Sequence, residues 1–162
     1  MEISNKLDAN LRHFHQLLRV NENFDVVYRV IQIGGRDACV YFVDGFAKDD
    51  TLLRILQGFT SLKPDAVPQT AHEFSKLFIP YGEVDLLTDD AEIAVQVLSG
   101  VPCLFVDGYS KCFAIDCRTY PARGVAEPDK DKVLRGSRDG FVETLVFNTA
   151  LIRRRIRDPQ MT

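Results

Sequence analysis

Residues that could carry out catalysis or bind a metal are few in this sequence, and their spacing fits no known catalytic or metal-binding motif. His13 and His15 are two positions apart, so on a helix they point to different sides and cannot share a metal ion. His72 has no second histidine near it. No Gly-x-Ser-x-Gly turn follows a strand, and the glycines do not have the spacing of a phosphate-binding loop. We therefore expect no enzymatic activity and no cofactor.

The cysteines do not favour a metal site either, because they form no Cys-x-x-Cys pair and have no paired histidines nearby. They are Cys39, Cys103, Cys112 and Cys117. Free cysteines are typical of a reducing cytosol. The first ten residues lack the apolar segment of a signal peptide, and no stretch of about 20 apolar residues could cross a bilayer. These features predict an intracellular domain.

Two Asp-Gly pairs follow apolar strands and offer a candidate pocket. Phe42-Val43-Asp44-Gly45 is repeated as Phe105-Val106-Asp107-Gly108, each time after a strand that contains a cysteine. Asp-Gly suits a tight turn, because glycine accepts a positive φ at little cost. Two ordinary strand ends would explain the repeat. A duplicated half-domain, or two loops that line a cleft with Asp44 and Asp107, are the alternatives.

Basic charge is concentrated near the C-terminus. Residues 1–117 hold 10 basic and 17 acidic groups, whereas residues 118–162 hold 10 basic and 6 acidic groups. The sharpest cluster consists of Arg153, Arg154, Arg155 and Arg157. A solvated helix end would account for this cluster. The functional alternative is contact with anionic lipid headgroups or with acidic groups of another domain.

Apolar periodicity and turn residues predict the order of elements. Helices are expected up to about residue 19, around 49–59, over 72–77, over 89–98 and over 139–157, with strands at 24–33, 39–43, 103–106 and 112–116. Gly34-Gly35 predicts a hairpin turn, and Gly100 predicts the end of a helix. The predicted fold class is α/β, with a mixed sheet built from hairpins, helices over it, and a long amphipathic C-terminal helix.

The last predicted helix carries an apolar stripe, which we interpret as core packing. The stripe consists of Phe141, Leu145, Val146, Thr149, Ile152 and Ile156. The loop before the helix contains Arg123, Glu127, Arg135 and Arg138, and Glu143 stands near the helix start. Ion pairs within this loop-to-helix junction, or a contact with another subunit, would each explain these charges.

Residues 118–158 read RTYPARGVAEPDKDKVLRGSRDGFVETLVFNTALIRRRIRD. This stretch resembles the spore germination A-subunit family, whose pattern runs R-x-Y-P-x-R-x-x-x-E-P, R-G-x-R-[DE]-G-F-x-E and N-x-x-L-I-R-x-R-I. The sequence of residues 137–159 resembles the stage V sporulation protein AF branch more than the nutrient-receptor branch. The family residues proposed for structure or interaction are Arg118, Arg123, Glu127, Arg135, Arg138, Glu143 and Asn148.

The resemblance implies the N-terminal region of a protein of the spore inner membrane, on the side of the spore core. Residues 1–158 would form the first subdomain, and 159–162 would begin a linker to a second subdomain. Implied partners are other copies of the same protein and a partner membrane protein of the germination machinery, with no nucleic acid. The implied role is assembly or regulation of an ion-channel or receptor complex. A small-molecule (germinant) binding module is the alternative.

Overall fold

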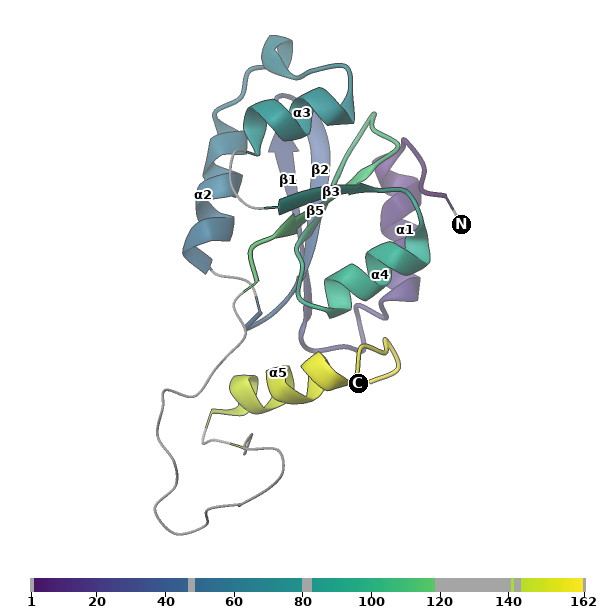
Figure 1. The fold of residues 1–162 in the computed structure, drawn as a ribbon. Coiled ribbons are helices and arrows are strands. Elements are labelled where there is room, and N and C mark those ends of the chain that lie inside the picture. Colours follow the sequence, from purple (N-terminus) through teal and green to yellow (C-terminus); the bar gives the residue numbers. More distant parts are fainter. Residues whose placement is uncertain (1, 47–48, 80–82, 119–140, 142–143, 162) are drawn as a thin grey trace.

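A five-stranded sheet lies between two pairs of helices, and a further helix packs across one end of it (Figure 1). The structure is a computed structural model and describes residues 2–46, 49–79, 83–118, 141 and 144–161. In chain order the elements are α1 (Leu7–Leu17), β1 (Val26–Ile33), β2 (Arg36–Val43), α2 (Asp49–Thr60), the 3₁₀ turn η1 (Pro64–Ala66), α3 (Ala71–Phe78), β3 (Glu83–Leu87), α4 (Asp90–Leu98), β4 (Cys103–Val106), β5 (Cys112–Asp116) and α5 (Leu145–Arg155).

The sheet has the order β1-β2-β4-β5-β3, and all its neighbouring strands are antiparallel. Gly34 and Gly35 join β1 to β2, and both have a positive φ, as the twist of a two-residue hairpin requires. The α/β fold class built from hairpins is confirmed. Strand β3 was not among the predicted strands, because Glu83 and Asp85 interrupt its apolar residues and leave only a short pattern.

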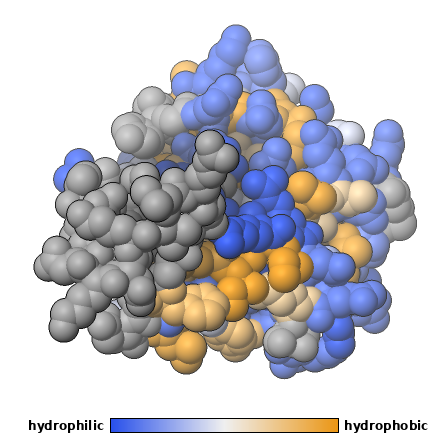
Figure 2. Space-filling view, turned by 60° about the horizontal axis from the view of Figure 1, so that its bottom comes forward, coloured by the Kyte–Doolittle hydropathy of each residue, from blue (hydrophilic) through white to orange (hydrophobic). Residues whose placement is uncertain are grey.

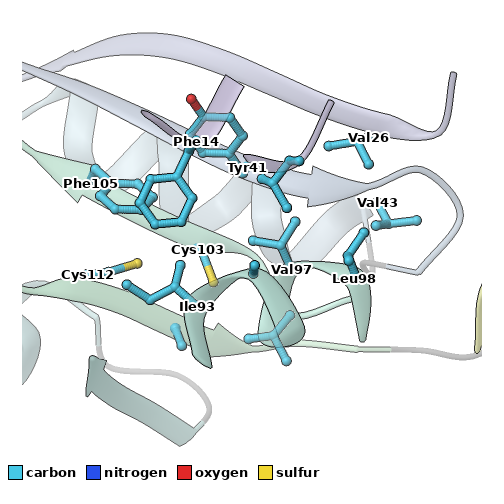
Figure 3. Close-up of a cluster of buried hydrophobic side chains, with 14 of the residues drawn as sticks. Phe14, Val26, Tyr41, Val43, Ile93, Val97, Leu98, Cys103, Phe105 and Cys112 are labelled. Atoms are coloured by element: carbon cyan, nitrogen blue, oxygen red, sulfur yellow. The ribbon is translucent and has the colours of Figure 1, made fainter. Parts of the chain in front are cut away.

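Strand alternation divides the apolar side chains into two cores. Odd-numbered residues of β2 and β4, such as Tyr41 and Phe105, pack with α1 and α4 (Figure 3). Even-numbered residues, such as Val40 and Leu104, pack with α2 and α3 on the other face. The sheet is therefore buried on both faces, which explains the near-continuous apolar runs in its central strands.

The thiols lie inside these cores. All four cysteines are free and buried, and Cys103 and Cys112 meet beside Ile93 in Figure 3. Burial raises the pKa of the Cys39 thiol from about 9 to about 12, and it also raises the pKa of Cys112.

Alkaline pH is therefore expected to destabilise the fold. Below pH 9 the Cys39 thiol is protonated in both the folded and the unfolded chain. Between pH 9 and about 12 it is protonated only in the folded chain. The free energy of unfolding should then fall by up to about 1.4 kcal/mol per pH unit for such a thiol. Urea unfolding at pH 8, 9, 10 and 11 measures this slope. A Cys39→Ala variant should show a shallower slope, and an equal slope would contradict the assignment.

Helix α5 is shorter than expected and presents a different side to the protein body. It begins at Leu145 and ends at Arg155, while residues 139–140 and 142–143 lie outside the described part of the chain. Its buried residues are Ala150 and Arg153, three positions apart, whereas Val146 is 39% exposed. Leu145 is 71% exposed. The expected core stripe is thus wrong for Phe141, Leu145, Val146 and Ile156, which are all exposed, and Ala150 and Arg153 are buried instead.

Candidate functional site

The main polar site of the described residues is built around Arg153, whose side chain is completely buried. Its Nε donates to Oδ2 of Asp25 at 2.8 Å, and its Nη2 donates to Oδ1 of Asp25 at 2.7 Å. Nη2 also donates to Oδ1 of Asn23 at 3.0 Å. The planar guanidinium suits this paired contact with a carboxylate. The arrangement joins α5 to the loop between α1 and β1.

That loop is fixed before the arginine reaches it. Asn23 is buried, and its side-chain amide donates to the carbonyl of Leu18 at 2.7 Å, at the C-terminal end of α1. The carbonyl of Asp25 accepts from the N–H of Asp44 at 2.8 Å, which ties the loop to the end of β2. These two hydrogen bonds hold the segment that carries the Asp25 carboxylate against the end of α1 and the end of β2.

The segment after α5 is bound at the same site. Arg153 donates from Nη1 to the carbonyl of Asp158 at 2.9 Å and from Nη2 to that of Met161 at 2.8 Å. Asn23 donates to the carbonyl of Pro159 at 3.0 Å. The residues expected to begin a linker at 159 are thus held against the domain. We call Asn23, Asp25 and Arg153, with the carbonyls of 158, 159 and 161, the C-terminal clasp.

The clasp has no features of a catalytic site. Both oxygens of Asp25 accept hydrogen bonds from Arg153, so the carboxylate is engaged as an ion-pair partner. What the clasp does is fix the direction of the chain after α5. Sequence reasoning missed Asn23 and Asp25, because they lie 130 and 128 positions from Arg153. The one signal in the sequence is a carboxylate directly before an apolar strand, which is too common to identify a partner.

The basic cluster predicted at 153–157 is divided by the structure. Arg153 is not available to a lipid or to another domain, because its guanidinium is buried against Asp25. Arg154, Arg155 and Arg157 are exposed at the end of α5. The sequence pattern could not make this distinction, since four arginines among five residues point in several directions around a helix.

Asp44 and Asp107 do not form the pocket proposed for them. Asp107 lies opposite the start of β2, where its N–H donates to the carbonyl of Asp37 at 2.8 Å. Asp44 follows the end of the same strand, seven positions further on, or roughly 23 Å at strand spacing. Antiparallel pairing of β2 with β4 therefore places the two turns at opposite ends of the sheet.

Asp107 has a structural contact instead. Its Oδ1 accepts from the N–H of Leu7 at 2.9 Å, at the first residue of α1. A carboxylate is favourable at this helix end, because the first N–H groups have no partner within the helix. Asp44 is exposed at the turn after β2.

Of the remaining predicted site residues, the structure describes Arg118 and Asn148. Arg118 follows β5, and its Nε donates to Oδ1 of Asp116 at 2.9 Å. This hydrogen bond lowers the pKa of the Asp116 carboxyl. Asn148 is half-buried in the first half of α5. Five further residues lie outside the described part of the chain: Arg123, Glu127, Arg135, Arg138 and Glu143.

The described residues contain no group of three histidine, cysteine or acidic side chains that could hold a metal ion. Within the same residues, every helix is too short or too polar to cross a membrane.

A comparison with family models connects this geometry to known proteins. The model described as Bacillus/Clostridium GerA spore germination protein matches residues 13–162. The chain belongs to the GerA family. The match includes every side chain of the clasp, and the family expected from residues 118–158 is confirmed.

Most of the curated relatives carry the names of sporulation or spore germination proteins. Stage V sporulation protein AF of Bacillus subtilis is 36% identical over 157 residues, which cover 94% of this chain and 31% of that protein. Spore germination protein B1 of Bacillus subtilis is 28% identical over 166 residues, which cover 99% of this chain and 33% of that protein. The chain spans about a third of the length of these relatives. The higher identity is to the branch that residues 137–159 indicated.

A solved structure supports the fold of this GerA chain. The N-terminal domain of the A subunit of the Bacillus megaterium spore germinant receptor GerK3 superposes with a TM-score of 0.73. The superposition covers 98% of this chain and 58% of that one, at 22% sequence identity. At this identity the likeness establishes a shared fold.

Proposed function

We propose that this chain is the spore-core-facing N-terminal domain of a germination protein of the spore inner membrane, and that it acts in the assembly or regulation of a channel or receptor complex. The outer surface of α5 is the observation that carries the proposal. Membership in the GerA family and relatives about three times as long support it. The domain has no enzymatic role in this proposal.

Several apolar side chains of α5 and its flanks face solvent. Leu145 is 71% exposed, Phe141 68% and Ile156 48%. Figure 2 brings this end of the molecule forward and shows apolar side chains gathered beside hydrophilic ones. Apolar groups that collect on one surface mark sites of contact with another protein or a membrane.

The clasp makes this surface suitable for transmitting a conformational change. Because Arg153 fixes α5 to Asp25, a partner that binds the outer side of α5 acts on a helix that cannot roll independently of the domain. The same arginine holds Asp158 and Met161, so the direction of the chain beyond 158 is tied to the position of α5. In the proposed complex, α5 contacts the rest of the membrane protein or its partner.

The test is a pair of substitutions in the full-length germination protein that carries this chain. Leu145→Glu with Ile156→Glu should reduce the amount of cross-linked complex recovered from spore membranes at least about tenfold, since burying each apolar side chain contributes roughly 1.5–3 kcal/mol. Spore germination, which is measured as the loss of optical density, should slow in parallel.

Leu77→Glu is the matched control, because Leu77 is an equally exposed leucine (66%) on α3, at the other end of the molecule (Figure 1). When they are measured as isolated chains, the variants should melt at the same temperature as the unsubstituted chain. Complex recovery equal to that of Leu77→Glu would refute the proposal. Loss of binding to phosphatidylglycerol vesicles, with intact complexes, would assign the surface to lipid instead.

A further inference from the structure

Strand β1 forms one edge of the sheet and has eight residues. It contains no proline or glycine and one charged residue, Arg29. The opposite edge strand, β3, has five residues, of which Glu83 and Asp85 are exposed and charged. Short length and charge are usual protections of a sheet edge against pairing with another chain. β1 lacks most of this protection.

The backbone register shows which groups of β1 point outward. The N–H of Asp44 donates to the carbonyl of Asp25, so residues of β1 at odd positions exchange hydrogen bonds with β2. The N–H of Asp107 donates to the carbonyl of Asp37, so the odd-numbered residues of β2 form hydrogen bonds with β4. The even-numbered residues of β2 are then the ones that bond to β1, which agrees with the register of that pair. Tyr28, Val30 and Gln32 therefore direct their N–H and C=O groups away from the sheet.

The outer edge is accessible along the same residues. Val30 is 57% exposed and Tyr28 is 41% exposed, although both are on the face that α1 covers further along the strand. Arg29 and Gln32 are exposed as well. Within the part of the chain that the structure describes, no hydrogen bond reaches the outward backbone groups of Tyr28, Val30 and Gln32. An apolar strand with open backbone groups is a template for strand addition.

We propose that this edge pairs with β1 of a second copy of the chain, in antiparallel orientation across a twofold axis, so that two sheets become one continuous sheet. Strand addition to an edge extends the ladder without any change inside the domain. A second copy is the occupant that the strand itself favours, because its β-branched and aromatic side chains pair well with each other.

Charge and burial select the register. Placing Arg29 opposite its own copy would set two like charges directly against each other. A register centred on Tyr28 would require Val26, which is 5% exposed, to take part. A register centred on Val30 sets Val30 opposite its own copy and Tyr28 opposite Gln32, and all three of these residues have outward backbone groups and exposed side chains.

This interface uses a different surface from the outer side of α5, and it goes beyond the proposed function by naming the partner strand. Because the edge is short, the pairing buries little area, and we expect a weak dimer of the isolated chain, in the range of about 10 µM to 1 mM. Anchoring of several copies in one complex would raise the effective concentration of the strands.

Sedimentation velocity of the 162-residue chain over that concentration range tests the proposal. Val30→Pro removes the outward N–H of Val30 and leaves the ladder to β2 intact, because that N–H is not part of it. It should weaken dimerisation at least about tenfold. Val30→Thr keeps the N–H and a β-branched side chain, and should retain dimerisation within about threefold.

Amide hydrogen exchange of the unmodified chain gives a second readout that does not depend on a variant. Protection of the amides of Tyr28, Val30 and Gln32 should rise with protein concentration, whereas the amides of Val27, Arg29 and Ile31 should be protected at every concentration. A monomer at 1 mM overturns the proposal. A dimer that Val30→Pro leaves unchanged, or whose formation does not protect the three outward amides, overturns it as well.

Discussion

Replacement of Arg153 by methionine is expected to lower the free energy of unfolding by about 3–5 kcal/mol. Methionine has a similar length but no charge, so the carboxylate of Asp25, which is 4% exposed, would remain buried without its partner. The carbonyls of Asp158 and Met161 would also lose their donor. Urea unfolding followed by circular dichroism measures the change.

Arg157→Met is the matched control, because the same substitution is made at an exposed arginine four positions further along. We expect its effect to stay within about 0.5 kcal/mol. Arg153→Lys should fall between the two, since lysine keeps the charge but cannot make the paired contact with both oxygens of Asp25. A double variant, Asp25→Leu with Arg153→Met, should lose less than the sum of the single variants. Equal unfolding free energies for Arg153→Met and Arg157→Met would show that the clasp does not stabilise the domain.

A second large effect is expected from Gly100→Ala, with a loss of about 2–5 kcal/mol. Gly100 has a φ of +89°, a conformation that alanine adopts at a cost. A Cβ at this position would also lie 2.5 Å from Cδ2 of Phe46, which is completely buried. Thermal and urea unfolding should both report the loss.

The reason for this conformation is the end of α4. The N–H of Gly100 donates to the carbonyl of Val97, and the N–H of Val101 donates to that of Gln96, which is the hydrogen-bond pattern of a Schellman motif. Gly58→Ala is the matched control, since Gly58 lies inside α2 with no atom within 4 Å of the added Cβ. It should stabilise the chain by about 0.5–1 kcal/mol. A Gly100→Ala variant as stable as the parent would mean that Phe46 moves aside without cost.

Local patterns predicted much of the fold. Gly34-Gly35 identified the first hairpin, Gly100 identified the end of α4, and apolar runs identified four of the five strands. These features depend on residues close together in sequence, where backbone preference and alternation act directly. The family resemblance came from the same kind of information, because its motifs occupy one continuous stretch, residues 118–158.

The candidate site could not be predicted in this way. The sequence placed Arg153 in a basic cluster and Leu145 in the core, and the structure reverses both positions. The apolar residues of α5 alone would allow either side of the helix to face the protein body. The carboxylate of Asp25, 128 positions away, decides the rotation, because a buried guanidinium requires a buried acceptor.

The two Asp-Gly turns illustrate the same division. The sequence by itself determined that Asp44 and Asp107 would each follow a strand in a tight turn, since glycine allows the positive φ at Gly45 and Gly108. Only the tertiary structure decided that the turns lie at opposite ends of the sheet, because strand direction and neighbour order arise from long-range pairing. The sequence likewise determined that β1 is a strand, and only the sheet order made it an open edge, since an edge is defined by the absence of a neighbour on one side.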